Sequence, residues 1–365
     1  MYTKRLMSFF SISVLLIAIL PAINLLNRSA LDGEVALPSD PSQLWSIDSA
    51  EGLLALRLWH CCEISLREGD VVVGQNGFLF LGNDHDRVID KITGRFQPTD
   101  REVENWAAMI GQLANTAEQR RAAFMFALAP NKHGVHSEHL PDGVEHADRT
   151  MTDRVLAALE RESVPIADLR AGLKEATEVA AVYLKTDTHW TKGGAALGYL
   201  GAITALQQLG LDVRPLEFQV IPRRGPAGDL ARMLKADGVL GAQHEVDQDV
   251  RFEQGSICAV AKPLSSPEML RCDPSAATAT ASFQNRVMES SYAPDAPNAQ
   301  RLLLICDSFC EAHRALYQAS FAEVHLVHWK TLVEFDFGTQ LERVSPDIVV
   351  FQLVERALLL PQFKM

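Results

Sequence analysis

The chain has few basic residues relative to acidic ones. It contains 34 Lys and Arg against 46 Asp and Glu, which gives a formal net charge of -12 at pH 7. Proteins that bind nucleic acid neutralise phosphates with clustered Lys and Arg, and the sequence has no such cluster. This shortage excludes nucleic acid as a partner.

Cysteine is also scarce, with six residues in a chain of 365. No pair has the C-x-x-C spacing of a zinc site, so we predict neither a metal site nor a cofactor. An oxidising compartment would permit disulfides, and Cys258 with Cys272 is the easiest pair to form because the segment between them is rich in Pro and Ser. Cys306 and Cys310 flank Ser308, and we expect them to pack in the core.

The chain does have enough apolar sequence for a full core. With 47% hydrophobic and 22% charged residues it is not a disordered protein, and it could hold one large domain or two smaller ones. Strand and helix patterns alternate, which predicts an α/β fold. The expected elements are a hairpin over Asp70–Leu81, helices from Thr99 and Thr152 and after Thr191, and strands over Ala122–Ala129, Val164–Ala167, Val179–Leu184, Arg301–Cys306, Val324–His328 and Pro346–Phe351.

An apolar run without charge, Leu6–Leu26, follows Lys4 and Arg5 and is long enough to span a bilayer. A cleaved signal peptide is the alternative, but the run exceeds a typical apolar signal core and no A-x-A site or lipobox cysteine follows it. The preceding positive charges place the rest of the chain outside the cytoplasm. We therefore divide the chain into an inner-membrane anchor (1–28), a linker (29–64) and a periplasmic catalytic domain (65–365) with an irregular insertion around 211–298.

Asp187 and His189 could form a catalytic pair. In an extended segment or loop, side chains two residues apart share a side, so Asp187 could accept the Nδ1–H of His189 and leave Nε2 free as a base. A D-x-H sequence is also common in ordinary loops. Thr191 then begins a helix that is narrow because it is rich in Gly and Ala.

Ser308 supplies the nucleophile that such a base needs. The serine follows an apolar strand at its turn into a helix, where backbone N–H groups could hold an oxyanion. Asp307-Ser308 could also be a simple helix cap. The histidines His133, His136 and His139, spaced by three in a loop-like segment, are expected to be solvated surface residues rather than metal ligands.

The motifs taken together resemble the alginate O-acetyltransferases AlgJ and AlgX from about residue 65 onward. The resemblance rests on Gly77-Phe78-Leu79-Phe80, Pro130-Asn131-Lys132, Asp187-Thr188-His189-Trp190, Asp307-Ser308-Phe309 and Pro346–Val350 followed by Glu355-Arg356. It implies an SGNH-hydrolase-like three-layer fold with a central, mainly parallel sheet and a triad of Asp187, His189 and Ser308. Lys132, Trp190, Phe309 and Arg314 are further candidates to contact the substrate or the oxyanion.

The same resemblance implies transfer of an acetyl group to hydroxyls of a secreted exopolysaccharide through an acetyl-serine. The acetyl donor would be a membrane-bound O-acyltransferase partner. Two departures matter: Cys306 replaces the usual Gly and could crowd the turn, and the chain ends soon after Arg356, which resembles AlgJ more than AlgX. An esterase with the same triad and a non-catalytic scaffold of an export machinery remain alternatives.

Overall fold

The computed structural model describes residues 69–237, 245–253, 257–263, 287–333 and 336–360, with residues 19, 21 and 22 near the N-terminus. The predicted linker 29–64 and, apart from those three residues, the predicted span Leu6–Leu26 lie outside the described residues. Among the helices that are described, none is both long and apolar enough to cross a membrane.

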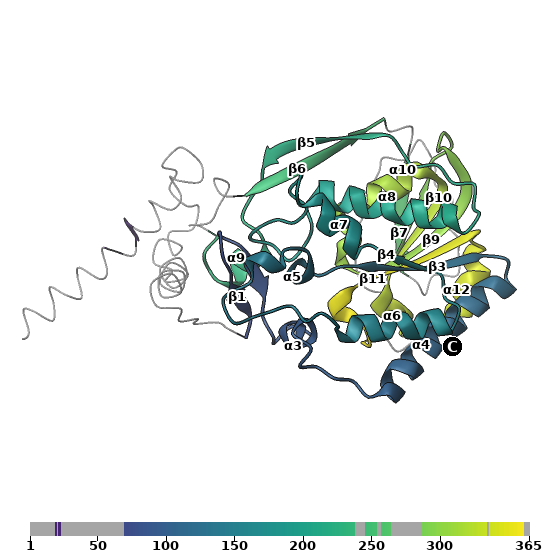
Figure 1. Cartoon of the computed structure of the whole chain (residues 1–365). Coiled ribbons are helices and arrows are strands. Elements are labelled where there is room, and N and C mark those ends of the chain that lie inside the picture. The colour runs from purple at the N-terminus through teal and green to yellow at the C-terminus, as the bar shows by residue number, and fades with distance from the viewer. Residues whose placement is uncertain are drawn as a thin grey trace, which may run out of the picture.

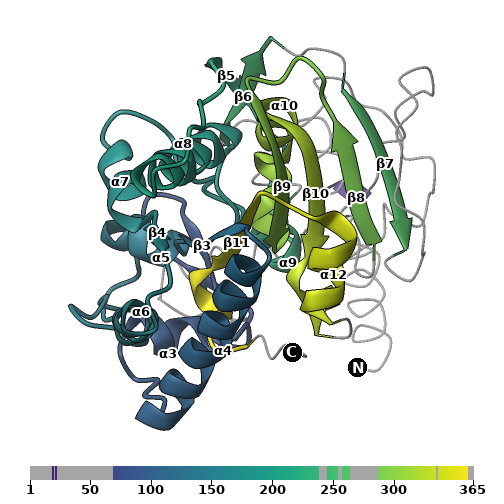
Figure 2. The ribbon, with the colours of Figure 1, turned by 90° about the vertical axis from the view of Figure 1, so that its right-hand side faces the viewer.

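A seven-stranded sheet forms the centre of the domain (Figures 1 and 2). Its first five strands are mutually parallel, β8 is antiparallel to β10, and β7 is antiparallel to β8. This arrangement confirms the predicted α/β fold with a mainly parallel sheet. In spatial order the strands are β4 (Ile166–Asp168), β3 (Ala123–Ala129), β11 (Ile348–Val354), β9 (Asn298–Cys306), β10 (Phe321–His328), β8 (Val287–Tyr292) and β7 (Cys258–Pro263).

Helices cover both faces of the sheet, as expected for parallel strands that are apolar on both sides. Every residue of β11 is buried, for example. The helices α7 (Arg170–Ala176), α8 (Lys192–Gln208) and α10 (Arg314–Ser320) lie on one face, and α4 (Asp100–Gln119), α6 (Met151–Arg161) and α12 (Phe337–Val344) on the other (Figure 1). The shorter helices are α3 (Val88–Ile92), α5 (Lys132–Val135), η2 (Ser137–His139), α9 (Asp229–Met233), η3 (Ser308–Ala312), α11 (Trp329–Leu332) and η4 (Glu355–Ala357).

Local sequence signals predicted several elements correctly. The hairpin consists of β1 (Val71–Val73) and β2 (Leu79–Leu81), and its turn places Asn76 and Gly77 at φ of 54° and 79°, which these two residue types tolerate. Thr99 and Glu102 form the predicted capping box of α4. Thr191 caps α8 by accepting a hydrogen bond from the Gly194 N–H.

Two predictions about elements need correction. The segment Val179–Leu184 is not a strand: it runs as a loop with a single bridge between Tyr183 and Trp190, and Val179 is 89% exposed. The region 211–298 is also more regular than predicted. Its strands β5 (Phe218–Arg224) and β6 (Val246–Phe252) pair with each other, and β7 and β8 extend the central sheet.

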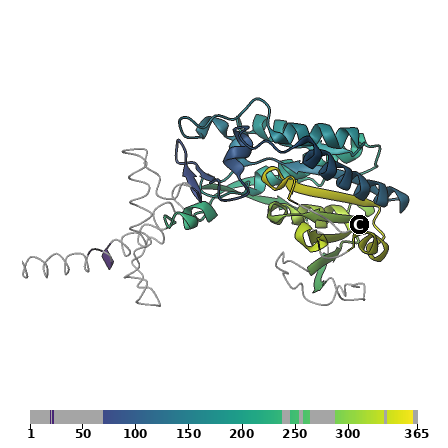
Figure 3. The same cartoon turned by 90° about the horizontal axis from the view of Figure 1, so that it is seen from below.

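A second apolar cluster joins the hairpin to α9, and both lie at the same end of the molecule (Figures 1 and 3). Val71 and Phe80 of the hairpin pack in one cluster with Leu230 and Leu234, all at most 2% exposed. Burial of such side chains contributes about 1.5 to 3 kcal/mol each. This packing brings Gly228 and Asp229, which begin α9, to the loop that carries His189.

Candidate active site

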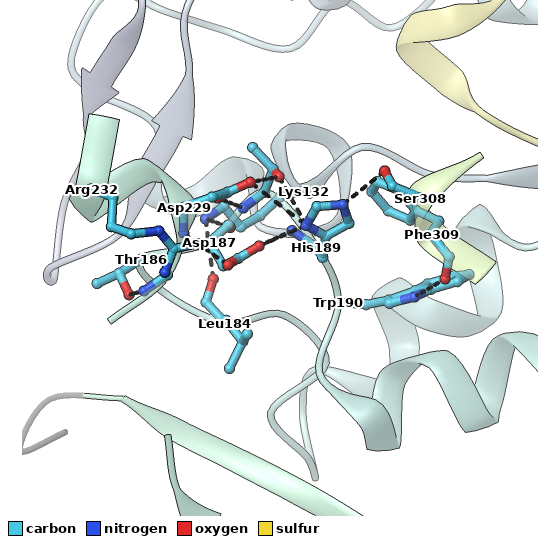
Figure 4. Close-up of polar contacts among 12 residues, drawn as sticks. Lys132, Leu184, Thr186, Asp187, His189, Trp190, Asp229, Arg232, Ser308 and Phe309 are labelled. Atoms are coloured by element: carbon cyan, nitrogen blue, oxygen red, sulfur yellow. Dashed lines mark hydrogen bonds and ion pairs between the residues drawn. The ribbon is translucent and has the colours of Figure 1, made fainter. Parts of the chain in front are cut away.

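The structure brings Asp187, His189 and Ser308 into one hydrogen-bonded row (Figure 4). His189 Nδ1 lies 2.7 Å from Asp187 Oδ1, and His189 Nε2 lies 2.9 Å from Ser308 Oγ. The two halves of this row come from positions 119 residues apart in the sequence. The row can transfer a proton from the serine hydroxyl to the imidazole while the carboxylate stabilises the resulting positive charge.

Asp187 is held as a carboxylate. Burial opposes its ionisation, but the hydrogen bond and charge of His189, together with the N–H groups of His189 and Asp229, lower the pKa of Asp187 well below its usual range. Asp187 therefore remains negatively charged at any pH near neutrality, as an orienting partner of an imidazole must.

Lys132 fixes the loop in front of this pair. Its side chain is buried, and Nζ donates to the carbonyl oxygens of Leu184, Lys185 and Asp187 at 3.1, 3.1 and 2.6 Å. An ammonium has three protons, so all of them are used on this loop. Burial lowers the pKa of Lys132 to about 8, while nearby carboxylates, chiefly that of Asp187, act in the opposite direction.

Glu245 holds the same loop at a second point. Its carboxylate accepts hydrogen bonds from the backbone N–H groups of Lys185 and Thr186 and from the Thr186 hydroxyl. Burial raises the pKa of Glu245, and these donors lower it in part. The Lys132 ammonium donates to carbonyl groups of this loop and the Glu245 carboxylate accepts from its N–H groups. Together they take the place of the hydrogen bonds that pairing in a sheet would have supplied.

The start of α9 holds the loop at a third point. The Asp229 N–H donates to Asp187 Oδ2 at 2.9 Å, and the Asp229 carboxylate accepts from the backbone N–H and the hydroxyl of Thr188. A Cβ atom on Gly228 would lie 2.4 Å from both Asp187 Cβ and the Thr186 carbonyl oxygen, so only glycine permits this approach. The sequence had left the role of Gly228-Asp229 undecided.

The turn that presents Ser308 is fixed by its neighbours. Asp307 accepts from the Phe309 N–H at 3.0 Å with one oxygen and from the Val354 N–H at 2.7 Å with the other, which ties the turn to β11. Burial raises the pKa of Asp307, and the Val354 N–H and the charge of Arg356 oppose that shift. The indole Nε1 of Trp190 donates to the Phe309 carbonyl at 3.0 Å, which links the base and nucleophile segments directly (Figure 4).

Cys306 and Cys310 pack in the core, as predicted, but they do so as a disulfide rather than as separate thiols. Both are fully buried. The Cys306 side chain does not displace the turn, because Ser308 Oγ lies at hydrogen-bond distance from His189 Nε2. Cys258 is disulfide-bonded as well, and Cys272, its predicted partner, lies outside the described residues.

The four residues proposed to contact substrate or oxyanion have other environments. Lys132 and Trp190 are each 2% exposed and Phe309 is fully buried. Lys132 and Trp190 hold neighbouring segments through the hydrogen bonds given above, and the predicted contact of the three residues with substrate or oxyanion stays a prediction. Arg314 is half-buried and pairs with Glu289 at 3.1 Å, and its predicted role stays a prediction.

The turn after Ser308 is not the long helix that the sequence suggested. A short 3-10 helix, η3, precedes α10, and the N–H groups of Phe309 and Cys310 donate to the side chain and the carbonyl of Asp307. Among the described residues the Ser308 N–H has no hydrogen-bond partner. That single N–H, rather than a helix terminus, is the backbone group at the turn that could meet an oxyanion.

Two groups of side chains in the described ranges have spacings that could hold a metal ion. In the first, Asp187, His189 and Asp229, the carboxylate oxygens already accept the hydrogen bonds given above. The second consists of His136, Glu138 and His139. The prediction that the three spaced histidines lie in solvent is wrong for His133 and His136, which are 3% and 6% exposed because they pack under the aromatic residues of the hairpin.

A cavity of about 480 Å³ opens beside this region at the carboxyl ends of β3 and β4. Its lining includes Gly134, Arg170, Lys174 and Glu355, and none of the row Asp187, His189 and Ser308. Because Arg170 is already paired with Asp153 and Asp168, we assign no role to this cavity.

The fold and the site define an α/β protein with a hydrolase-like row of aspartate, histidine and serine at the carboxyl edge of a parallel sheet. The sequence profile of the family described as SGNH hydrolase-like domain, acetyltransferase AlgX matches residues 71–259, slightly more than half of the chain. The chain belongs to this family. The matched range includes Asp187 and His189 and ends before Ser308.

Curated relatives agree with that assignment. The chain is 30% identical over 194 residues to the protein of Pseudomonas syringae pv. tomato named "Probable alginate O-acetylase AlgJ", covering 50% of this chain and 47% of that protein. The protein of the same name from Pseudomonas aeruginosa is 27% identical over 199 residues, covering 50% and 46%. The chain thus spans about half the length of the curated relatives it matches.

Two solved structures share the fold. The O-acetyltransferase domain of Pseudomonas putida AlgJ superposes with a TM-score of 0.52 at 19% identity, covering 80% of this chain and 93% of that one. PatB1 of Bacillus cereus superposes with a TM-score of 0.57 at 18% identity, covering 81% and 100%.

Lys132→Met should lower kcat by about 100-fold with a smaller effect on KM, because a loosened loop misplaces His189 relative to Ser308. Methionine keeps the apolar stem but removes the ammonium donor from three carbonyl groups, of which only that of Lys185 keeps another donor among the described residues, the Leu79 N–H. The matched control is Lys185→Met, which removes one bond from the same loop to Asn76. Steady-state kinetics and circular dichroism of both variants are the measurement, and equal kcat in the two would contradict the role of Lys132.

Proposed function

We propose that this protein is a serine O-acetyltransferase that acetylates hydroxyl groups of a secreted, alginate-like polysaccharide. The observation that carries the proposal is the 2.9 Å contact between Ser308 Oγ and His189 Nε2, with Asp187 on the other imidazole nitrogen. The names of the relatives support the acetyl group and the polysaccharide. Membership of the acetyltransferase family supports the reaction type.

The first half-reaction forms an acetyl-serine. His189 Nε2 takes the hydroxyl proton as Ser308 Oγ attacks the carbonyl carbon of the acetyl donor, and the Asp187 carboxylate stabilises the imidazolium. The Ser308 N–H is placed to donate to the oxyanion of the tetrahedral intermediate. His189 then returns the proton to the leaving group, and the acetyl group remains on Ser308.

The second half-reaction transfers the acetyl group to the polysaccharide. His189 takes the proton of a sugar hydroxyl, whose oxygen attacks the acetyl-serine, and collapse of the intermediate returns the proton to Ser308 Oγ. Water at the same position would give an esterase. The His189 side chain is 30% exposed, so the imidazole is open to solvent on one side.

The alternatives differ in what resolves the acetyl-serine. An esterase would release acetate at the same rate with or without an acceptor oligosaccharide. A scaffold would bind oligosaccharide without forming an adduct. Its support in the sequence is Cys306 in place of the usual Gly, and the 2.9 Å contact between Ser308 Oγ and His189 Nε2 argues against it. A genomic neighbourhood with polysaccharide synthesis genes and a multi-span acyltransferase would favour the transferase and its membrane-bound donor partner.

Ser308 should become acetylated when the protein is incubated with an activated acetyl ester. Mass spectrometry should locate the adduct on the peptide containing Ser308, and an acceptor oligosaccharide should remove it while gaining an acetyl group. Ser308→Ala should show no adduct, whereas the matched change Ser290→Ala, on β8, should retain it. Adduct formation that persists in Ser308→Ala would overturn the assignment of the nucleophile.

Asp187→Asn should reduce turnover by up to about 10⁴-fold, by comparison with the serine protease triad, because the amide can stabilise the tautomer whose Nε2 carries the proton. Such an imidazole cannot accept the proton of Ser308. Asp249→Asn, which alters a surface pair with Lys192, is the control and should leave kcat unchanged. Normal turnover in Asp187→Asn would remove this carboxylate from the mechanism.

We propose that the domain faces the periplasm and is held at the inner membrane by Leu6–Leu26. The support is the uninterrupted apolar run that follows Lys4 and Arg5. Cell fractionation should recover the full chain with membranes, and external protease should digest it in spheroplasts. Recovery of a soluble chain shortened at its N-terminus would show that the run is a cleaved signal.

A further inference from the structure

Three side chains gather away from Ser308, at the end of α5 and in η2. One possible ligand atom from each of His136, Glu138 and His139 lies within 4.8 Å of the others. Glu138 Oε1 is 3.3 Å from His136 Nδ1 and 3.7 Å from His139 Nε2. The carboxylate thus faces one nitrogen of each imidazole.

These separations suit a small metal ion. Zinc bonds to imidazole nitrogen and carboxylate oxygen are about 2.0 to 2.2 Å long, so the ligand atoms of a tetrahedral zinc site lie roughly 3.3 to 3.6 Å apart. The two observed contacts, at 3.3 and 3.7 Å, match this spacing to within about 0.2 Å. Two imidazoles and one carboxylate are also a common donor set for zinc.

Packing holds both imidazoles in place before any ion binds. The Phe78 ring centroid lies 4.8 Å from that of His136 and 4.2 Å from that of His139, and the Tyr183 ring meets His136 edge to face. Side chains locked by packing lose little conformational freedom when they ligate an ion. Glu138 is half exposed, which leaves a side of the cluster open to solvent ligands.

Hydrogen bonding alone does not account for this cluster. His136 is 6% exposed, and its Nε2 has no hydrogen-bond partner in the part of the chain that the structure describes. An ion pair with the exposed Glu138 carboxylate contributes little and does not offset the burial of an imidazole. A cation bound at Nδ1, the nitrogen that faces Glu138, would add a stronger stabilising interaction to this buried ring.

The surroundings of His139 support a ligand role. Its Nδ1 lies 3.3 Å from the side-chain amide of Asn76, so the second nitrogen of this ring already has an orienting neighbour. A half-turn of the Asn76 amide presents its oxygen to an Nδ1–H and leaves Nε2 as the ligand atom.

We propose that His136, Glu138 and His139 bind one divalent transition-metal ion of the zinc type, with solvent completing its coordination. The site lies beside the β1–β2 hairpin, because the Gln75 N–H donates to the His139 carbonyl at 2.8 Å. The hairpin in turn contacts the loop before Asp187. Lys185 of that loop donates from Nζ to the Asn76 carbonyl, and the Leu79 N–H donates to the Lys185 carbonyl. The ion therefore stabilises the hairpin against the loop that continues to Asp187.

The test is a zinc titration of the full, untagged chain after removal of metals with a chelator. Calorimetry should give one zinc ion per chain, and His139→Gln and Glu138→Gln should each weaken binding at least about tenfold. His85→Gln changes a half-exposed histidine that is paired with Asp70, and it should bind as the parent does. Both ligand variants are at solvent-accessible positions, so circular dichroism should show that they fold.

Two further measurements separate this site from the row at Ser308. X-ray absorption should show two imidazole nitrogens in the zinc coordination sphere, and His189→Ala should leave the affinity unchanged. Loss of zinc binding in His189→Ala with retention in His139→Gln would place the ion at Asp187, His189 and Asp229 and overturn the proposal. Equal affinity in all variants, or no binding by the parent chain, would overturn it as well.

Discussion

The interaction on which this site depends is the contact of one buried ammonium with three carbonyl groups. The loop from Leu184 to His189 has no strand or helix hydrogen bonds to hold it, and Lys132 supplies them from the end of β3. A buried charge is stable there because every proton has an acceptor and the Glu245 and Asp187 carboxylates lie close by. A loop at the edge of a sheet is thereby held by hydrogen bonds in place of those of a regular element.

The nucleophile turn is held by a matching set of contacts from the other side. Asp307 joins it to β11 through the Val354 N–H, the disulfide closes it around Ser308, and Trp190 connects it to the base. Preorganisation of this kind matters because a displacement of about 1 Å between base and nucleophile can cost about 100-fold in rate. Residues next to the motifs in sequence, such as Asp307 and Trp190, thus hold the segments of the site in place.

The two aspartates of the site, Asp187 and Asp307, have pKa values shifted in opposite directions. The lowered pKa of Asp187 keeps it ionised, and the raised pKa of Asp307 reflects a buried carboxyl whose oxygens are committed to backbone donors. The two aspartates differ in their partners: Asp187 contacts an imidazole in addition to peptide N–H groups, whereas both Asp307 oxygens accept from peptide N–H groups.

The sequence by itself determined the elements whose signals are local: the Asn76-Gly77 turn, the Thr99 cap, the apolar strands, and the two motifs that carry His189 and Ser308. Only the tertiary structure decided which distant segments meet, because hydrophobic periodicity reports which face of an element is buried and not what it packs against. It turned the predicted strand Val179–Leu184 into a loop, moved Lys132 into the interior and paired Cys306 with Cys310. The order of strands in the sheet brings residues 119 positions apart to hydrogen-bond distance, and that order depends on the packing of the whole domain.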